Sequence, residues 1–157
     1  MTGLRIIMIT TAASLLLSGL VAAQDQGKRI RRSELPAAVD ETVRAESHGA
    51  TIRGFSQEKE NGKTFYEAEL TVNGHSKDVL MDAGGEVVEV EEQVSIENVP
   101  AAVRDGLQTK AGKGKLVKVE SLTRKGKLVA YEAEVLTNGK RSEIQVGPDG
   151  KPLTHEE

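Results

Sequence analysis

Two pairs of carboxylates are the residues whose types and spacing are most compatible with catalysis or metal binding. Glu67 and Glu69, and again Glu132 and Glu134, stand two residues apart in stretches that alternate apolar and polar side chains. In a strand this spacing places both carboxylates of a pair on one face, about 7 Å apart. Such pairs can serve general acid–base catalysis or bind a hard cation. The same alternation is typical of the solvated side of a half-buried sheet, and we favour this second interpretation.

Other catalytic groups are absent from the sequence or isolated in it. The chain has no cysteine, and its histidines are His48, His75 and His155. None of them lies in a nucleophile motif such as G-x-S-x-G, and their spacing is not that of metal ligands. The run Asp82–Glu86 lacks the alternating oxygen ligands of a calcium loop and is interpreted as a turn. The sequence therefore predicts no catalytic residue, no metal site and no cofactor, and we do not expect an enzyme.

Residues 1–23 have the pattern of a removable export signal. Arg5 is the only charge, Leu15–Leu17 form the centre of an apolar run, and Val21–Ala23 offer small side chains for cleavage before Gln24. The alternative is an uncleaved anchor, but the apolar run is barely long enough to span a bilayer and is interrupted by polar residues. We expect a periplasmic or secreted protein with no stable membrane span after cleavage.

The charge balance excludes one class of partner. Without residues 1–23 the chain has 20 Lys+Arg and 24 Asp+Glu, for a net charge near −4. A nucleic-acid-binding protein would carry a basic surface instead. With no cysteine there are no disulfides, so the fold must depend on its hydrophobic cores.

The sequence repeats itself. Leu35–Val39 (LPAAV) returns as Val99–Val103 (VPAAV) at an offset of 64 residues. Tyr66–Glu69 (YEAE) returns unchanged as Tyr131–Glu134 at an offset of 65, so one extra residue is expected near Val129–Ala130. Two such blocks in the same order indicate a duplication.

Each copy predicts one helix followed by antiparallel strands. Apolar residues recur every fourth position after a proline, and form one buried helical stripe: Leu35, Val39 and Val43 in the first copy, Val99, Val103 and Leu107 in the second. Strict alternation follows in each copy, interrupted by Asn73-Gly74 and Asn138-Gly139, which are strong hairpin signals. The predicted fold class is α+β, with two tandem units of one helix packed on a three- or four-stranded antiparallel sheet. Because each unit is small, the two are expected to pack together or to run their sheets side by side.

The domain boundaries follow from these patterns. Residues 1–23 are the signal, 24–34 a basic polar tether, 35–92 the first repeat, 93–98 a linker and 99–157 the second repeat. Pro152 predicts a weak edge strand or an extended tail at the end of the second repeat.

Three short motifs have partners in the second copy: Leu35–Val39, Tyr66–Glu69 and Met81–Val88 (MDAGGEVV). Together they resemble the PepSY-like family, which includes variants described as β-lactamase-inhibitor-like. The resemblance implies an extracytoplasmic, non-catalytic module that binds or restrains other envelope proteins, peptidases among them. The related inhibitor architecture presents its sheet to an enzyme. The family has no shared catalytic residues, and the sequence departs from its pattern over Gly147–Pro152.

The first functional hypothesis is a binding module whose partner is an envelope or secreted protein, with inhibition or modulation of an envelope enzyme such as a peptidase as its specific form. The outward sheet face is the candidate partner-binding surface: Phe65, Glu67, Glu69, Lys77, Leu80, Glu132, Glu134, Glu143 and Gln145. The alternative is a protein that binds a small ligand or a divalent cation through the outward carboxylates. A weaker hypothesis gives the basic tether, with Lys28, Arg29, Arg31 and Arg32, a role at anionic lipid or cell-wall polymer; a solvated linker is favoured over it.

Overall fold

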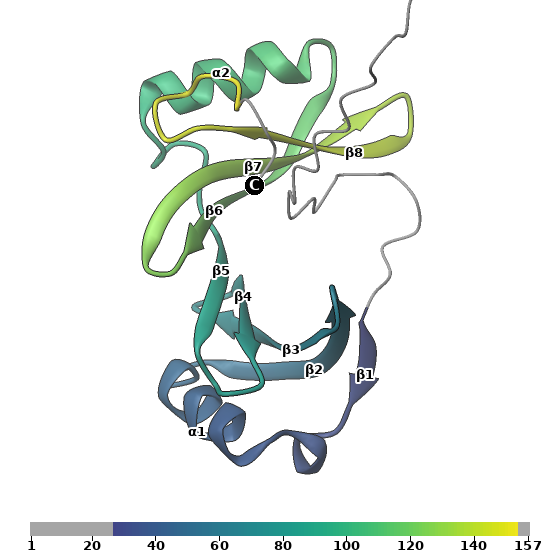
Figure 1. Cartoon of the computed structure of the whole chain (residues 1–157). Helices are drawn as coiled ribbons and strands as arrows, with labels where there is room; N and C mark the ends of the chain where they lie inside the picture. The colour runs from purple at the N-terminus through teal and green to yellow at the C-terminus, as the bar shows by residue number, and fades with distance from the viewer. Residues whose placement is uncertain (1–26, 154–157) are drawn as a thin grey trace, which may run out of the picture.

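A computed structural model describes residues 27–153 of the chain (Figure 1). The predicted signal, residues 24–26 of the predicted tether and residues 154–157 of the second repeat, which include His155, lie outside these described residues. Within them no helix is long and apolar enough to cross a membrane. The elements, in chain order, are β1 (Lys28–Ile30), a 3-10 turn η1 (Arg32–Glu34), α1 (Ala37–Glu46), β2 (Thr51–Glu60), β3 (Lys63–Val72), β4 (His75–Asp82), β5 (Val87–Gln93), α2 (Ala101–Ala111), β6 (Lys115–Arg124), β7 (Lys127–Thr137) and β8 (Lys140–Val146).

All eight strands form one antiparallel sheet in the order in which they occur in the sequence. The predicted fold class, two tandem units that each have a helix on a sheet of their own, is therefore wrong. The reason lies at β5, which pairs with β4 on one side and with β6 on the other, from Glu89 opposite Arg124 to Gln93 opposite Glu120. A strand left unpaired at a sheet edge exposes a row of backbone donors and acceptors, and here β6 satisfies that row.

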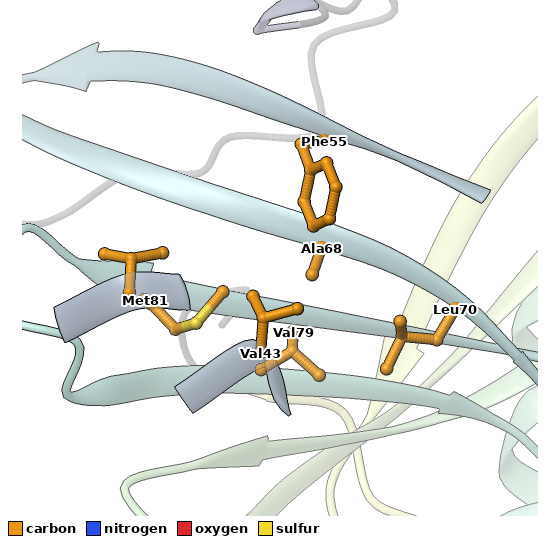
Figure 2. Packing of buried hydrophobic residues seen from close by; sticks show 7 residues of the cluster. Val43, Phe55, Ala68, Leu70, Val79 and Met81 are labelled. Carbon is orange, nitrogen blue, oxygen red and sulfur yellow. The ribbon is translucent and has the colours of Figure 1, made fainter. Parts of the chain in front are cut away.

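Both helices begin directly after a proline and bury the predicted apolar stripe. Pro36 and Pro100 precede α1 and α2, where a residue without an N–H group costs no helical hydrogen bond. Val39 and Val43 are buried in α1, and Val103 and Leu107 in α2. Each stripe packs on the inward-pointing residues of the neighbouring strands, and Figure 2 shows Val43 facing Ala68, Val79 and Met81. A second buried cluster joins α2 to Val119, Ala133 and Val146.

The hairpin turns are as the sequence predicts. Asn73-Gly74 joins β3 to β4 and Asn138-Gly139 joins β7 to β8, with all four residues at positive φ. Asn and Gly tolerate this backbone region, which matches the twist of the adjoining strands.

The two ends of the sheet differ from the sequence-based boundaries. The segment expected as a tether contains β1, whose three residues pair with Phe55–Gln57 of β2. After β8 the chain turns at Gly147–Gly150 and forms no further strand up to residue 153. Pro152 has no N–H to donate to a ladder, which accounts for the missing strand.

The register places α1 and α2 on the same side of the sheet. Ala68, Val79 and Val90 lie opposite one another on the side that α1 covers, while Val119 and Ala133 form a registered pair on the side that α2 covers. Across the junction Val90 lies opposite Thr123 and Glu91 opposite Leu122, which keeps the two sides continuous. The sheet bends so that both helices lie on its outer side and the bare sides of its two halves turn toward each other (Figure 1).

Candidate binding face

The side of the sheet that carries no helix is called the open face here. Residues directly opposite in antiparallel strands share a face, so the register defines its members. From β3 to β8 they include Phe65, Glu67, Glu69, Asp78, Leu80, Glu89, Glu91, Glu120, Leu122, Arg124, Glu132, Glu134, Glu143 and Gln145. The open face is continuous from one half of the sheet to the other and rich in carboxylates.

The structure places every residue of the predicted partner-binding surface on the open face except Lys77. Lys77 pairs in register with the buried Leu70, so its side chain lies on the helix side, where its Nζ is 2.9 Å from Glu46 Oε2 of α1. Assigning Lys77 to the outward face was therefore wrong. Alternation from Val79, which the sequence already marks as inward, places Lys77 inward as well.

Arginines pair with the acids near both ends of the open face. Arg29 of β1 forms an ion pair with Glu69, and Arg141 of β8 forms one with Glu134. Arg29 reaches Glu69 by lying across Gly54, where any Cβ atom would overlap with the guanidinium. Glu143, opposite Glu134 in the register, is exposed. At these ends the acidic charge is largely balanced.

Several acids nearer the centre also have partners. Arg124 Nε lies 2.6 Å from Glu89 Oε2, and Lys118 Nζ lies 2.5 Å from Glu120 Oε1. Neutral groups hold two more: Ser56 Oγ donates to Glu67 Oε2 at 2.7 Å, and Gln145 Nε2 donates to Glu132 Oε2 at 2.7 Å. These contacts leave Asp78 and Glu91, on β4 and β5, as the central acids without a hydrogen bond or ion pair among residues 27–153.

Asp78, Glu91 and Glu120 form a carboxylate cluster at the junction of the two halves. One carboxylate oxygen from each lies within 4.8 Å of the others. Asp78 and Glu91 are directly opposite in the β4–β5 register, and Glu69 continues the same row on β3. This is the only group of three or more potential metal-ligating side chains that residues 27–153 bring so close together.

Burial makes ionisation of Asp78, Glu91 and the neighbouring Glu132 unfavourable. Desolvation, the largest cause, and the charges of Glu132, Glu89, Glu120 and Asp78 together raise the pKa of Glu91 to about 8. Desolvation is also the largest cause at Asp78 and at Glu132, where the pKa is raised to about 6 in each case. A carboxyl group that leaves water without a counter-charge retains its proton to a higher pH. Glu91 is therefore largely protonated at neutral pH.

Apolar side chains lie beside the acids. Leu122, opposite Glu91, is only 2% exposed, and Ala130 opposite Leu122 is fully buried. Leu80 lies between Glu67 and Glu89 in the register and is partly exposed. The β6–β7 pairing is irregular here. Leu122 lies opposite Ala130 and Thr123 lies opposite Leu128, so Val129 has no partner in the register. This bulge falls where the repeat offset changes from 64 to 65 residues.

The sequence-based reasoning missed the central acids. Asp78 alternates with the inward Val79, and Glu89 and Glu91 alternate with Val90, so a signal for their outward direction was present. No local sequence pattern predicts that β5 pairs with β6, and this pairing brings Glu120 close to Glu91. The predicted pairs Glu67–Glu69 and Glu132–Glu134 flank this cluster and are not its members.

The described histidines do not contribute to the open face. His48 follows α1 and His75 begins β4 at the Asn73-Gly74 turn, and both are exposed. A shallow hollow beside the start of α1, lined by Arg32, Asp40 and Arg44, lies apart from the open face, and its Asp40 is paired with both arginines. The open face is therefore the feature of the described residues best suited to bind another molecule.

Comparison with known proteins identifies the architecture. No protein-family model matches the sequence, and no curated protein matches it significantly. A BLIP-like protein from Bacteroides fragilis is similar in structure, with a TM-score of 0.56, 20% identity, and coverage of 76% of this chain and 83% of that one. A Bacteroides eggerthii protein provisionally assigned to the periplasm gives a TM-score of 0.62 at 18% identity over 78% and 88% of the two chains. A DUF2874 family protein from Bacteroides ovatus gives 0.60 at 17% identity over 78% and 86%. The chain thus has the fold of BLIP-like and DUF2874 proteins, while the PepSY-like name and the duplication stay predictions.

Proposed function

We propose that this chain is an exported, non-catalytic binding protein of the cell envelope whose open face engages another envelope or secreted protein. The observation that carries the proposal is the continuous, helix-free side of one bent sheet, on which Asp78 and Glu91 remain partly buried without a counter-charge. Burying unpaired carboxylates costs stability, and such a cost is typical of functional surfaces. Similar folds in a BLIP-like protein and in a protein provisionally assigned to the periplasm support this role and location.

Binding agrees better than catalysis with the side chains available. The open face offers carboxylates, a few paired cations and apolar side chains, and within residues 27–153 no histidine lies among them. General acid–base catalysis needs a second group that holds or delivers the proton on a substrate. Modulation of an envelope enzyme, including inhibition of a peptidase, requires only that the face cover part of that enzyme.

Affinity capture tests the proposal. The chain without residues 1–23 is immobilised and exposed to an envelope extract, and bound proteins are identified by mass spectrometry. A variant with Glu67, Glu69, Glu132 and Glu134 changed to Lys should lose the partner, because these side chains belong to the open face. The matched control reverses four acids that are exposed outside the sheet, and so has the same change in net charge: Glu34, Glu41, Glu97 and Asp105.

The two variants distinguish the loss of a specific contact at the open face from an effect of net charge. A protein that is retained by the control and lost by the open-face variant supports the proposal, provided that circular dichroism shows both variants folded. A protein retained equally by both would place the binding surface elsewhere. Inhibition is then measured directly on the purified partner.

A second candidate function is binding of a divalent cation, and the carboxylate cluster is the observation that favours it. Asp78, Glu91 and Glu120 place oxygens within 4.8 Å of one another, and carboxylate oxygen is the ligand that Ca²⁺ and Mg²⁺ prefer. The test is thermal unfolding at pH 8 with increasing Ca²⁺, Mg²⁺ or Mn²⁺. A dose-dependent gain in Tm that disappears in Asp78→Asn/Glu91→Gln supports a metal site, and an unchanged Tm contradicts it.

A further inference from the structure

The two edge strands of the sheet that residues 27–153 form differ in length. β1 has three residues, whereas β8 has seven, and Lys140–Glu143 at the start of β8 are all exposed. An edge strand presents backbone N–H and C=O groups with which a further strand can pair. β8 is therefore the edge with the greater capacity for pairing.

The hairpin before β8 determines which of its backbone groups point away from β7. Thr137 and Lys140 flank the two-residue turn Asn138-Gly139 and are the first pair of the β7–β8 register. In such a hairpin the flanking pair exchanges its backbone hydrogen bonds. Bonded and non-bonded pairs then alternate, so the odd-numbered residues of β8 direct their N–H and C=O groups outward.

Two contacts at the far end of β8 agree with this direction. Gln145 O accepts a hydrogen bond from Lys110 Nζ of α2 at 3.1 Å, and Gly147 N donates to Lys151 O at 2.8 Å. The outward backbone groups of Arg141 and Glu143 have no such contact with residues 27–153. These two residues are the part of the edge that is open to another strand.

The side chains of Arg141 and Glu143 carry opposite charges on the open face. Glu143 lies directly opposite Glu134 of β7, and Arg141 forms an ion pair with Glu134. Directly opposed like charges destabilise an antiparallel pair, and Glu143 has no ion pair among residues 27–153. A second guanidinium beside Glu143 would offset this repulsion.

We propose that two copies of this chain associate by antiparallel pairing of β8 with β8, with Ser142 of one copy opposite Ser142 of the other. In this register Arg141 of each copy lies opposite Glu143 of the other, and their outward backbone groups bond to one another. A two-fold axis relates the copies, so each favourable contact occurs twice. The open faces of both copies then lie on the same side of one longer sheet, whatever molecule that face binds.

The charges select this register among those that the backbone allows. Only odd-numbered residues have outward groups, so the next registers shift the strands by two residues. One of them places Arg141 opposite Arg141, and the other places Glu143 opposite Glu143. Charged side chains on an edge commonly prevent pairing; here they oppose the neighbouring registers and favour the proposed one.

A disulfide cross-link tests the register directly. Because Ser142 bonds to β7, the two Ser142 residues form a non-hydrogen-bonded pair with Cα atoms about 4.5 Å apart, which suits a disulfide. The chain has no cysteine of its own. Under mild oxidation, Ser142→Cys in the chain without residues 1–23 should form at least about tenfold more covalent dimer than Lys140→Cys, whose two copies lie about 14 Å apart along the strands.

Complementary charge variants test the contact between copies. Arg141→Glu and Glu143→Arg should each weaken self-association by about tenfold, because each places like charges opposite one another. An equal mixture of the two should associate as the unchanged chain does, since every opposed pair then has opposite signs. Sedimentation velocity from about 10 to about 500 μM measures this, a range suited to a small interface. Lys113→Glu and Glu41→Arg, exposed outside β8, make the same charge changes and should leave association unaltered.

Circular dichroism first establishes that every variant is folded. A chain that stays monomeric throughout this range, equal cross-linking by Ser142→Cys and Lys140→Cys, or a mixture that fails to associate would overturn the inference. Cross-linking of Ser142→Cys that appears only after residues 154–157 are removed would also overturn it, by placing the chain's own end on β8. None of these outcomes bears on capture of an envelope partner by the open face, so the proposed function is tested separately.

Discussion

The two halves of the sheet end differently, and the difference explains why a single strand pairing, β5 with β6, joins them. In the first half the turn at Asp82–Glu86 leads into β5, which pairs on both sides. In the second half the corresponding turn at Gly147–Lys151 is followed by Pro152, and no strand forms beside β8 up to residue 153. β5 thus supplies the junction, whereas β8 is an edge strand of the sheet that residues 27–153 form.

The largest expected effect comes from breaking that junction. Hydrogen bonds from Val94 N to Val119 O and from Lys125 N to Val88 O show that alternate residues of β6, Ser121 among them, direct their N–H toward β5. Ser121→Pro removes one such donor and places a ring against the neighbouring strand. We expect a loss of about 3 kcal/mol in the free energy of unfolding, and a single urea transition that separates into two.

The control for this change is Ser121→Val, which keeps the backbone donor. It removes only the 3.4 Å contact from Ser121 Oγ to Glu92 O, and should change stability by less than about 0.5 kcal/mol. If Ser121→Pro still unfolds in one transition at the stability of the control, then β5–β6 pairing does not couple the halves.

The corresponding turns of the two halves allow a second comparison. Gly85 and Gly150 both adopt positive φ and both press against a helix: a Cβ at Gly85 would stand 2.6 Å from Ala38 O of α1, and a Cβ at Gly150 would overlap with Ala102 O of α2 more severely. Substitution by Ala adds left-handed strain to this clash. We expect a loss of about 3 kcal/mol for Gly150→Ala and about 2 kcal/mol for Gly85→Ala, measured by urea unfolding.

A third glycine, Gly139, separates the cost of backbone strain from the cost of a steric clash with a helix. Gly139 has a φ of 78°, the same as Gly150, but a Cβ there would meet nothing within 4 Å. Gly139→Ala should therefore cost only the strain, about 1 kcal/mol. Equal losses at all three glycines would show that the packing of the turns on the helices contributes nothing.

The acids of the junction give the sheet a pH-dependent stability. The pKa of Glu91 is about 8 in the folded chain against 4.5 when unperturbed. Glu91 costs the fold no stability below about pH 4.5, where both states hold the proton. The free energy of unfolding then falls as the pH rises from 4.5 to 8, because the folded state still holds a proton that the unfolded state has released. Glu91→Gln cannot ionise. Its free energy of unfolding should exceed that of the unchanged chain by about 2 kcal/mol at pH 8.5 and should differ little from it at pH 4.5.

Chemical unfolding across this pH range checks the effect. Glu41→Gln, on the exposed side of α1, serves as the control and should follow the pH profile of the unchanged chain. A profile of Glu91→Gln that runs parallel to both would mean that Glu91 is not held protonated by the fold.

These comparisons also show how far the sequence predicts the structure. Both helical stripes and both Asn-Gly hairpins could be read locally, because helix and strand periodicities and turn chemistry depend on near neighbours. The open-face positions of Glu67, Glu69, Glu132 and Glu134 follow from alternation alone. The carboxylate cluster could not be predicted in this way, because Glu91 and Glu120 meet only through a strand pairing that spans α2. Which strand pairs with an open edge is decided by packing across the whole sheet.

The smallest expected effects compare an ion pair at the edge of the sheet with one at its centre. Arg29 and Glu69 have side chains 58% and 34% exposed, whereas those of Arg124 and Glu89 are 28% and 11% exposed. Water and salt screen the edge pair, so Arg29→Gln should cost no more than about 0.5 kcal/mol. Arg124→Gln leaves Glu89 buried beside other acids without its cation, and should cost about 1 kcal/mol.

Urea unfolding in low salt and in 0.5 M NaCl measures both losses. The loss at Arg29 should disappear in salt, while most of the loss at Arg124 should persist because buried charges are poorly screened. A salt-sensitive loss at Arg124 would mean that water reaches the junction freely, and the case for costly unpaired acids there would weaken with it. A salt-resistant loss means that the middle of the open face holds the Arg124–Glu89 pair in a partly dry setting, where removing one charge leaves the other without a partner.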